Sequence, residues 1–154
     1  MNIIILLGLI INAHTVPVIS EYETTLRDGY ANEILWQGGT LIYAHNYLSG
    51  IEFYNLDIGE IVSAYYSDGS TKEFQVSKKD AYAFGNLNNQ SDLRVNYHWV
   101  EIGKVISMYS APDSITLFTC YPEIGQTTGR LFVELNPYEN EANDVAQLDS
   151  ELIH

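Results

Sequence analysis

The most constraining feature of this sequence is a succession of short β-rich runs separated by turn-forming residues. No stretch between residues 9 and 137 keeps a 3.6-residue apolar period for three turns, which excludes long amphipathic helices. The predicted strands are Leu9–Ile19, Thr40–Ala44, Glu60–Tyr66, Thr71–Val76, Trp99–Ile102, Val105–Tyr109, Ile115–Cys120 and Arg130–Leu135. Because short strands must hide their edges, we expect an all-β, closed or nearly closed barrel of about eight strands with short helices or turns in its loops.

Three local signals refine this prediction. Asp68-Gly69 stands between two of the predicted strands and indicates a tight β-hairpin, because such a turn needs positive φ angles. The polar, Asn-rich segment Gly85–Asp92 is predicted to be a long loop. Pro17 lacks a backbone N–H, so it places the first predicted strand at an edge or at a bulge.

The two ends of the chain differ from the part between them. The apolar run Ile3–Ile11 follows Met1-Asn2, which carries no basic residue, and the run is too short to cross a bilayer. Residues 1–8 are left open as the stub of an export or anchor segment, and residues 9–137 are predicted to form the barrel domain. Residues 138–154 hold five carboxylates and no Lys or Arg, which predicts a mobile acidic tail or a short surface helix.

Charge and cysteine content limit the possible functions. Seven Lys and Arg against twenty Asp and Glu give a formal net charge of −13. Proteins bind nucleic acid through clustered basic side chains that displace counterions, so nucleic acid is excluded as a partner. The single cysteine, Cys120, cannot form an internal disulfide or a thiolate metal cage. It is either a small buried hydrophobic residue, the usual state of a lone cysteine, or a reactive thiol.

Three residues with useful chemistry lie at the ends of predicted strands. His45 ends one strand and opens a loop, Cys120 ends another, and Arg130 begins the strand that follows Cys120. A hairpin of the last two strands would place Cys120 and Arg130 on facing strands at the same rim of the barrel. The set combines a thiol nucleophile, an acid or base, and a permanent positive charge.

The segments around these residues resemble the sortase family of cysteine transpeptidases. The resemblance rests on Leu41–Asn46 (LIYAHN), on Thr116–Cys120 (TLFTC) and on Arg130–Val133 (RLFV), in that order, and extends from Leu9 to Leu135. It implies a sortase-like barrel in which Cys120 is the nucleophile, His45 the acid, and Arg130 the group that holds the oxyanion or the substrate backbone. The expected substrate-binding residues are Thr119, Tyr121 and Asn46. No metal and no cofactor are expected.

The sequence also departs from the family pattern at two places. Many sortases have Gly directly before the histidine, where this chain has Ala44. The stretch from Gly85 to Trp99 differs from the corresponding region of sortases, which helps to form their substrate groove. Substrate specificity is therefore not transferred to this chain.

The resemblance implies a definite reaction and leaves two alternatives. The expected reaction cleaves a C-terminal sorting signal of the Leu-Pro-x-Thr-Gly type through a thioacyl intermediate at Cys120 and transfers it to an amine of a cell-wall peptide or of a pilin lysine. The expected partners are surface proteins or pilins bearing that signal, and the expected location is extracytoplasmic, at the cell surface or the membrane. One alternative is a catalytically silent sortase-like barrel that acts as a protein- or glycan-binding module. The other is an ordinary small-molecule or glycan-binding barrel that uses some of the twelve tyrosines.

Overall fold

The computed structural model describes residues 3–19, 30–36, 39–86, 89–96, 98–109, 111–121 and 128–139. Their helices are α1 (Ile51–Tyr54) and α2 (Ile102–Ser107). Their strands are β1 (Leu6–Ile11), β2 (His14–Ile19), β3 (Ala31–Trp36), β4 (Gly39–Tyr43), β5 (Ile61–Tyr66), β6 (Thr71–Asn86), β7 (Asn89–Val95), β8 (His98–Glu101), β9 (Ile115–Tyr121) and β10 (Gly129–Pro137). No helix of these segments is long and apolar enough to cross a membrane.

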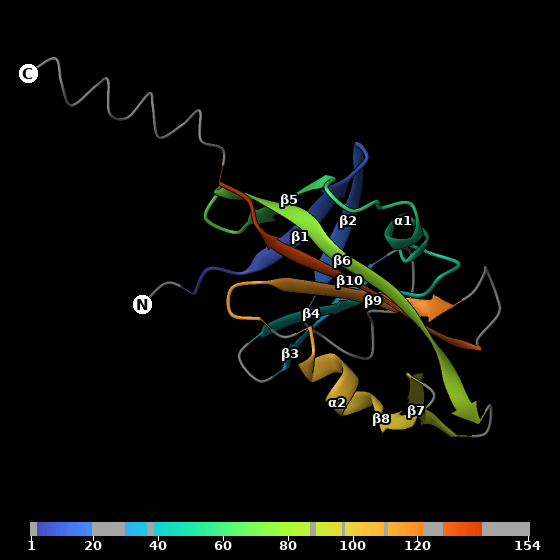
Figure 1. Cartoon of the computed structure of the whole chain (residues 1–154). Helices are drawn as coiled ribbons and strands as arrows, with labels where there is room; N and C mark the ends of the chain where they lie inside the picture. Colours follow the sequence, from blue (N-terminus) through green and yellow to red (C-terminus); the bar gives the residue numbers. More distant parts are fainter. Residues whose placement is uncertain are drawn as a thin grey trace, which may run out of the picture.

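Eight strands form a closed barrel (Figure 1), in the order β10-β9-β4-β3-β2-β1-β5-β6. The barrel closes because β10 also pairs with β6, antiparallel, in a register that runs from Gly129 opposite Ala83 to Pro137 opposite Phe74. The far end of β6 leaves the barrel and pairs with β7, which pairs with β8. The predicted all-β barrel of about eight strands is confirmed, and closure gives each barrel strand a partner on both sides along at least part of its length.

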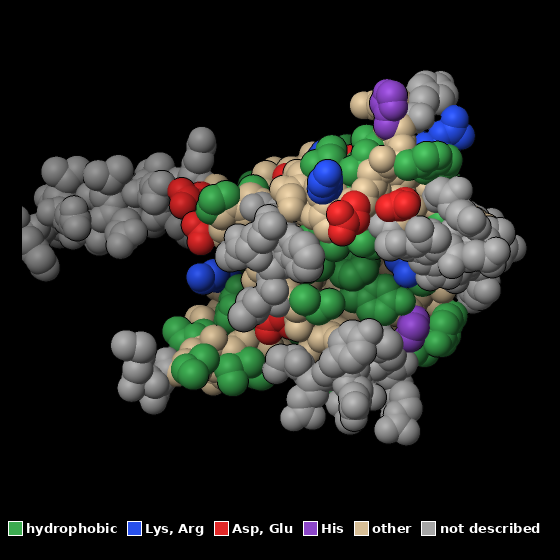
Figure 2. Space-filling view, turned by 90° about the horizontal axis from the view of Figure 1, so that it is seen from below, with side chains coloured by type: hydrophobic (Ala, Val, Ile, Leu, Met, Phe, Trp, Pro, Cys, Tyr) green, Lys and Arg blue, Asp and Glu red, His purple; other side chains and the backbone are tan. Residues whose placement is uncertain are grey.

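Side chains alternate between two hydrophobic cores along the strands that carry the site. Ile42, Leu117 and Leu131 point into the barrel, where they join the larger core. Their neighbours point outward, where α2, β7 and β8 cover the wall of the barrel. This outer core contains Leu41, Phe84, Leu93, Val105, Ile106, Tyr109, Phe118 and Phe132. Figure 2 shows this side of the molecule, with hydrophobic side chains over much of the described surface and charged side chains scattered among them.

The prediction of one strand over Leu9–Ile19 is wrong. Asn12 and Ala13 have φ angles of 49° and 65°, and they form the turn between β1 and β2. Two successive positive φ angles suit the twist of a tight antiparallel hairpin. Because β1 begins at Leu6, the last part of the open segment 1–8 belongs to the sheet. Pro17 precedes the parallel pairing of β2 with β3, which begins at Val18, so its missing N–H costs no hydrogen bond on that side.

The strand predicted over Val105–Tyr109 is also wrong, because this segment ends α2 and the turn after it. Val105 and Ile106 of α2, and Tyr109 in the turn after it, are buried in the outer core. A short apolar run fits a strand and a helix equally well, and packing against the barrel wall decides in favour of the helix.

The loop predicted over Gly85–Asp92 is replaced by the end of β6 and the start of β7, which pair at Phe84 with Leu93. Polar residues are tolerated in this ribbon because it leaves the barrel. The hairpin predicted at Asp68-Gly69 is confirmed between β5 and β6, with Gly69 at φ 84°. The predicted tail lies outside the described residues from position 140 onward, and the division of the chain at residues 8 and 137 stays a prediction.

Candidate active site

The hairpin of β9 and β10 places two of the predicted site residues directly opposite each other. Arg130 pairs with Cys120 in the antiparallel register, and directly opposite residues point to the same face of a sheet. Nη1 of Arg130 donates a hydrogen bond to Sγ of Cys120 at 2.9 Å. A charge-assisted contact of this kind stabilises negative charge on the sulfur.

The third predicted residue reaches this face from the other neighbour of β9. β4 runs parallel to β9, with Tyr43 opposite Phe118, so the Tyr43 ring lies on the outer face together with Cys120. His45 follows two residues later, and its Nδ1 lies 3.1 Å from the Tyr43 hydroxyl oxygen. The same oxygen lies 3.6 Å from Sγ of Cys120. Cys120, His45 and Arg130 therefore converge, with the Tyr43 hydroxyl between the imidazole and the sulfur.

Packing fixes these side chains from several sides. The guanidinium of Arg130 lies over the ring of Phe84, with Cζ 4.9 Å from the ring centroid. Its Nε is buried and has no hydrogen-bond partner among the described residues. The Tyr47 ring stacks on the imidazole of His45 at a centroid distance of 4.9 Å. These contacts restrict the rotamers of the arginine and the histidine, which is what a preorganised site requires.

The electrostatics of the site favour neutral His45 and neutral Tyr43. Burial, and secondly the positive charge of Arg130, lower the pKa of His45 below its usual value. Burial, together with the hydrogen bond to Cys120, raises the pKa of Tyr43 above its usual value. The permanent positive charge beside the sulfur is therefore the guanidinium. A donor of Arg130, and not the His45 imidazole, lies in direct contact with the sulfur.

Among the comparisons with known proteins, the one with solved structures identifies the fold. No protein-family model matches the sequence, and no curated protein matches it. Among solved structures, sortase C-1 from Actinomyces oris is 20% identical, with a TM-score of 0.61 over 86% of this chain and 71% of that one. This chain has the sortase fold. Sortase C1 from Streptococcus suis is also 20% identical (TM-score 0.60; 88% of this chain, 74% of that one), and the lid mutant of sortase A from Corynebacterium diphtheriae is 15% identical (TM-score 0.63; 90% and 73%).

Within this sortase fold, Thr119 is not brought to the face that carries Cys120. It is fully buried on the inner side of β9, and its Oγ1 donates a hydrogen bond to the carbonyl oxygen of Ala44 at 2.6 Å. Gly50 packs beside this hydroxyl, where a Cβ atom would also lie only 2.6 Å from the carbonyl oxygen of His45. Thr119 thus ties β9 to the backbone segment that carries the histidine, and a direct substrate contact of Thr119 stays a prediction.

The other two predicted substrate-binding residues lie in different surroundings. Asn46 is 3% exposed, whereas the side chain of Tyr121 is 37% exposed at the end of β9. The Tyr121 ring stacks on the ring of Tyr54, whose hydroxyl donates to the carbonyl oxygen of Cys120. The backbone of the cysteine is therefore held from the α1 side. Substrate contacts of Asn46 and Tyr121 stay predictions.

Two further residues of the site were missed by sequence reasoning. Tyr43 could have been found from its spacing, because residues two apart on a strand share a face. Tyr82 lies opposite Arg130 on β6 and extends the row of outward side chains. Its hydroxyl contacts the hydroxyl of Tyr109, which donates to Oδ2 of Asp80 at 2.7 Å. This chain of contacts fastens the turn after α2 to the barrel wall.

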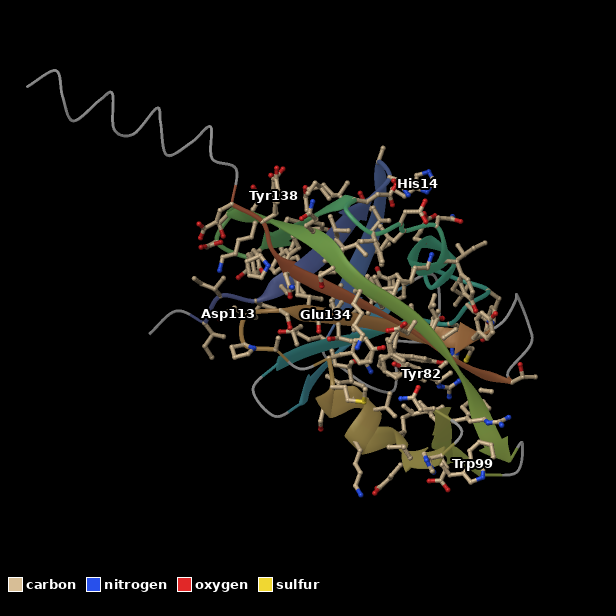
Figure 3. The ribbon with its side chains drawn as sticks, in the orientation of Figure 1. His14, Tyr82, Trp99, Asp113, Glu134 and Tyr138 are labelled. Atoms are coloured by element: carbon tan, nitrogen blue, oxygen red, sulfur yellow. The ribbon has the colours of Figure 1, made fainter. Side chains whose placement is uncertain are left out.

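A separate hollow lies at the other end of β9. Its volume is about 480 Å³, and its lining includes Glu33, Tyr66, Asp113 and Ile115 but no predicted site residue. Figure 3 shows Tyr82 and Asp113 toward opposite ends of the barrel. Across the described segments, no group of three or more His, Cys, Asp or Glu side chains could hold a metal ion.

Proposed function

We propose that this chain is a sortase-like cysteine transpeptidase. It cleaves a C-terminal sorting signal of the Leu-Pro-x-Thr-Gly type, forms a thioacyl intermediate at Cys120 and transfers the acyl group to an amine. One observation carries this proposal: on a sortase fold, a guanidinium nitrogen of Arg130 lies 2.9 Å from the sulfur of Cys120. The Tyr43 hydroxyl connects His45 to the same sulfur.

Each residue has a role that its chemistry allows. The Cys120 thiolate attacks the carbonyl carbon of the scissile peptide bond, so that an S–C bond forms and the carbonyl π electrons move to oxygen. Arg130 has five N–H donors in a fixed plane and its Nε is buried, so the N–H groups of its two terminal nitrogens that are not directed at the sulfur can hold the oxyanion or the substrate backbone together with the N–H of Tyr121. When the C–N bond breaks, His45 gives the leaving amine its proton. An acceptor amine then attacks the thioester and gives a proton to the now neutral His45, and the carbonyl re-forms as the sulfur leaves as a thiolate.

The partners and the location follow from the same proposal. The donors are surface proteins or pilins that carry a sorting signal, and the acceptor is an amino group of a cell-wall peptide or of a pilin lysine. The chain works outside the cytoplasm, at the cell surface or the membrane. The sortase fold of the neighbouring structures supports this placement.

One observation favours a second candidate. Cys120 is only 7% exposed, as a cysteine that serves merely as a small hydrophobic residue would be. The second candidate is therefore a catalytically silent sortase-like barrel that acts as a protein- or glycan-binding module. It predicts a thiol that neither sorting peptides nor small electrophiles reach.

Mass spectrometry separates the two candidates. The protein is incubated with a library of sorting-signal peptides and an amine, and the transpeptidase should show a thioacyl adduct at Cys120 and a transfer product. Cys120→Ala should show neither. Arg130→Lys keeps the charge but loses the planar fork, so turnover should fall by at least about 10²-fold. A matched control is Arg94→Lys on β7, where the guanidinium lies over Trp99 at 5.7 Å.

The possible outcomes are distinct. Alkylation of Cys120 by iodoacetamide should persist in Arg130→Lys, because it needs the thiol and not the oxyanion site. A thiol that reacts with neither iodoacetamide nor any peptide of the library contradicts the transpeptidase and supports the binding module. Near wild-type turnover in Arg130→Lys contradicts the assigned role of the arginine.

A further inference from the structure

The Tyr43 hydroxyl is the structural link between His45 and Cys120. It lies 3.1 Å from Nδ1 of the imidazole and 3.6 Å from the sulfur. Among the described residues, His45 makes its side-chain hydrogen bond to Tyr43 and makes none to Cys120. A proton that passes between the thiol and the imidazole in this geometry has one hydroxyl in its path.

We propose that the Tyr43 hydroxyl is a catalytic proton relay between Cys120 and His45. The inference rests on the proposed transpeptidase function for its use in turnover, but the relay itself acts on the free thiol. It assigns chemistry to a residue of the predicted strand Thr40–Ala44 that the predicted catalytic set of His45, Cys120 and Arg130 does not include.

The relay balances as a shift of two protons. In the neutral state the thiol S–H points to the Tyr43 oxygen, and the Tyr43 O–H points to Nδ1 of His45. When the Tyr43 oxygen takes the thiol proton and passes its own proton to Nδ1, the products are a thiolate and an imidazolium, and Tyr43 is unchanged. In that state the imidazolium donates to Tyr43, and Tyr43 donates to the thiolate.

The surroundings of Tyr43 suit this role. Burial keeps its pKa above the usual value, so the hydroxyl stays neutral and can donate and accept at once. Its ring packs against Phe118 at a centroid distance of 4.8 Å, which holds the hydroxyl in place. The titratable and charged groups that face it are Cys120 from β9, Arg130 from β10, and His45 and Tyr47 from the segment after β4.

The geometry also assigns the two nitrogens of His45. Because Nδ1 is engaged with Tyr43, the nitrogen left for the substrate is Nε2. After the relay the imidazolium carries a proton on each nitrogen, and the Nε2 proton goes to the leaving amine when the C–N bond breaks. The acid of the reaction is thus supplied by the same proton shift that creates the nucleophile.

The test is a double-mutant cycle read by alkylation. The rate of iodoacetamide alkylation of Cys120 is measured against pH in the wild type, Tyr43→Phe, His45→Asn and the double variant. Tyr43→Phe removes only the hydroxyl, and the pH of half-maximal alkylation should rise by roughly one unit because the thiolate loses a donor. His45→Asn should shift this midpoint in the wild-type background and have little effect in the Tyr43→Phe background.

A matched control removes a different hydroxyl near the same imidazole. Tyr47→Phe keeps the stacked ring, and the side chain that it alters is 54% exposed. Its midpoint should stay within about 0.2 pH unit of the wild type. If Tyr43→Phe does not fold, difluorotyrosine at position 43 replaces it. This residue keeps the shape and is a stronger donor, so the midpoint should fall.

The relay is overturned if His45→Asn shifts the midpoint equally with and without the Tyr43 hydroxyl, because the histidine then acts on the sulfur directly. It is also overturned if Tyr43→Phe leaves the midpoint unchanged. Alkylation needs no sorting signal, so these results are independent of the proposed function. A relay that is present without any thioacyl adduct contradicts the transpeptidase alone, and an adduct without the relay contradicts only the role of Tyr43.

Discussion

Replacing Thr119 with Val tests whether this residue holds the site together or binds substrate. The side chain is fully buried, and its hydroxyl donates to the carbonyl oxygen of Ala44 at 2.6 Å. Valine has the same shape but no donor, so it leaves this carbonyl without its partner, at a cost of about 1 to 3 kcal/mol in the free energy of unfolding. In a domain of this size 1 kcal/mol corresponds to about 2 to 4 °C, so the melting temperature should fall by about 2 to 12 °C.

The assay combines thermal unfolding, followed by circular dichroism, with the kinetics of peptide acylation well below the melting temperature. Thr119→Val should lower kcat, because the segment that carries His45 loses its tie to β9, and should leave KM unchanged. Thr119→Ser is the matched control, since it keeps the hydroxyl and loses only a methyl group, at a cost of about 1 kcal/mol. If Thr119→Val melts like the wild type but raises KM, the structural reasoning is refuted and the predicted substrate contact is supported.

Three further changes test the packing and the charges. Gly50→Ala forces a Cβ atom to within 2.6 Å of the His45 carbonyl oxygen and should destabilise the fold by about 1 to 3 kcal/mol in urea unfolding; wild-type stability would mean that the loop moves freely. Burial raises the pKa of Glu33, so its stabilising contribution is present below about pH 4.5 and is lost as the pH rises through the folded-state pKa. Glu33→Gln should therefore raise the melting temperature by about 1 to 3 °C at pH 7 but not at pH 4, and an equal change at both values contradicts this reasoning. Tyr109→Phe removes the hydroxyl that donates to Oδ2 of Asp80 at 2.7 Å and leaves this oxygen with Lys78 Nζ at 3.8 Å, so stability should fall by about 1 to 2 kcal/mol; an unchanged melting temperature would contradict this role of the hydroxyl.

Local patterns in the sequence determined much of the barrel. The runs that became β4, β9 and β10 are short, rich in β-branched and aromatic residues and bounded by turn-forming residues, and Asp68-Gly69 marks the hairpin of β5 and β6. These signals are readable because they depend only on neighbours along the chain. The β1–β2 turn was not readable, because Ala13 takes a positive φ angle within an apolar run that has no glycine at that point. The helix at α2 was not readable either, because its short apolar run takes its conformation from the barrel wall.

The candidate site divides in the same way. Cys120 and Arg130 come from strands that are consecutive in the sequence, so their facing positions followed from one hairpin, and the register confirms that pairing. The position of the Tyr43 hydroxyl beside Cys120 depends on the parallel pairing of β4 with β9, whose partners lie more than 70 residues apart. The sequence by itself determined which residue types stand at the strand ends and which faces they share. The tertiary structure decided which strands became neighbours, because closure of the barrel through β6 and β10 is a long-range pairing that no local period encodes. By setting these neighbours, the tertiary structure also decided that a tyrosine hydroxyl lies between the histidine and the sulfur.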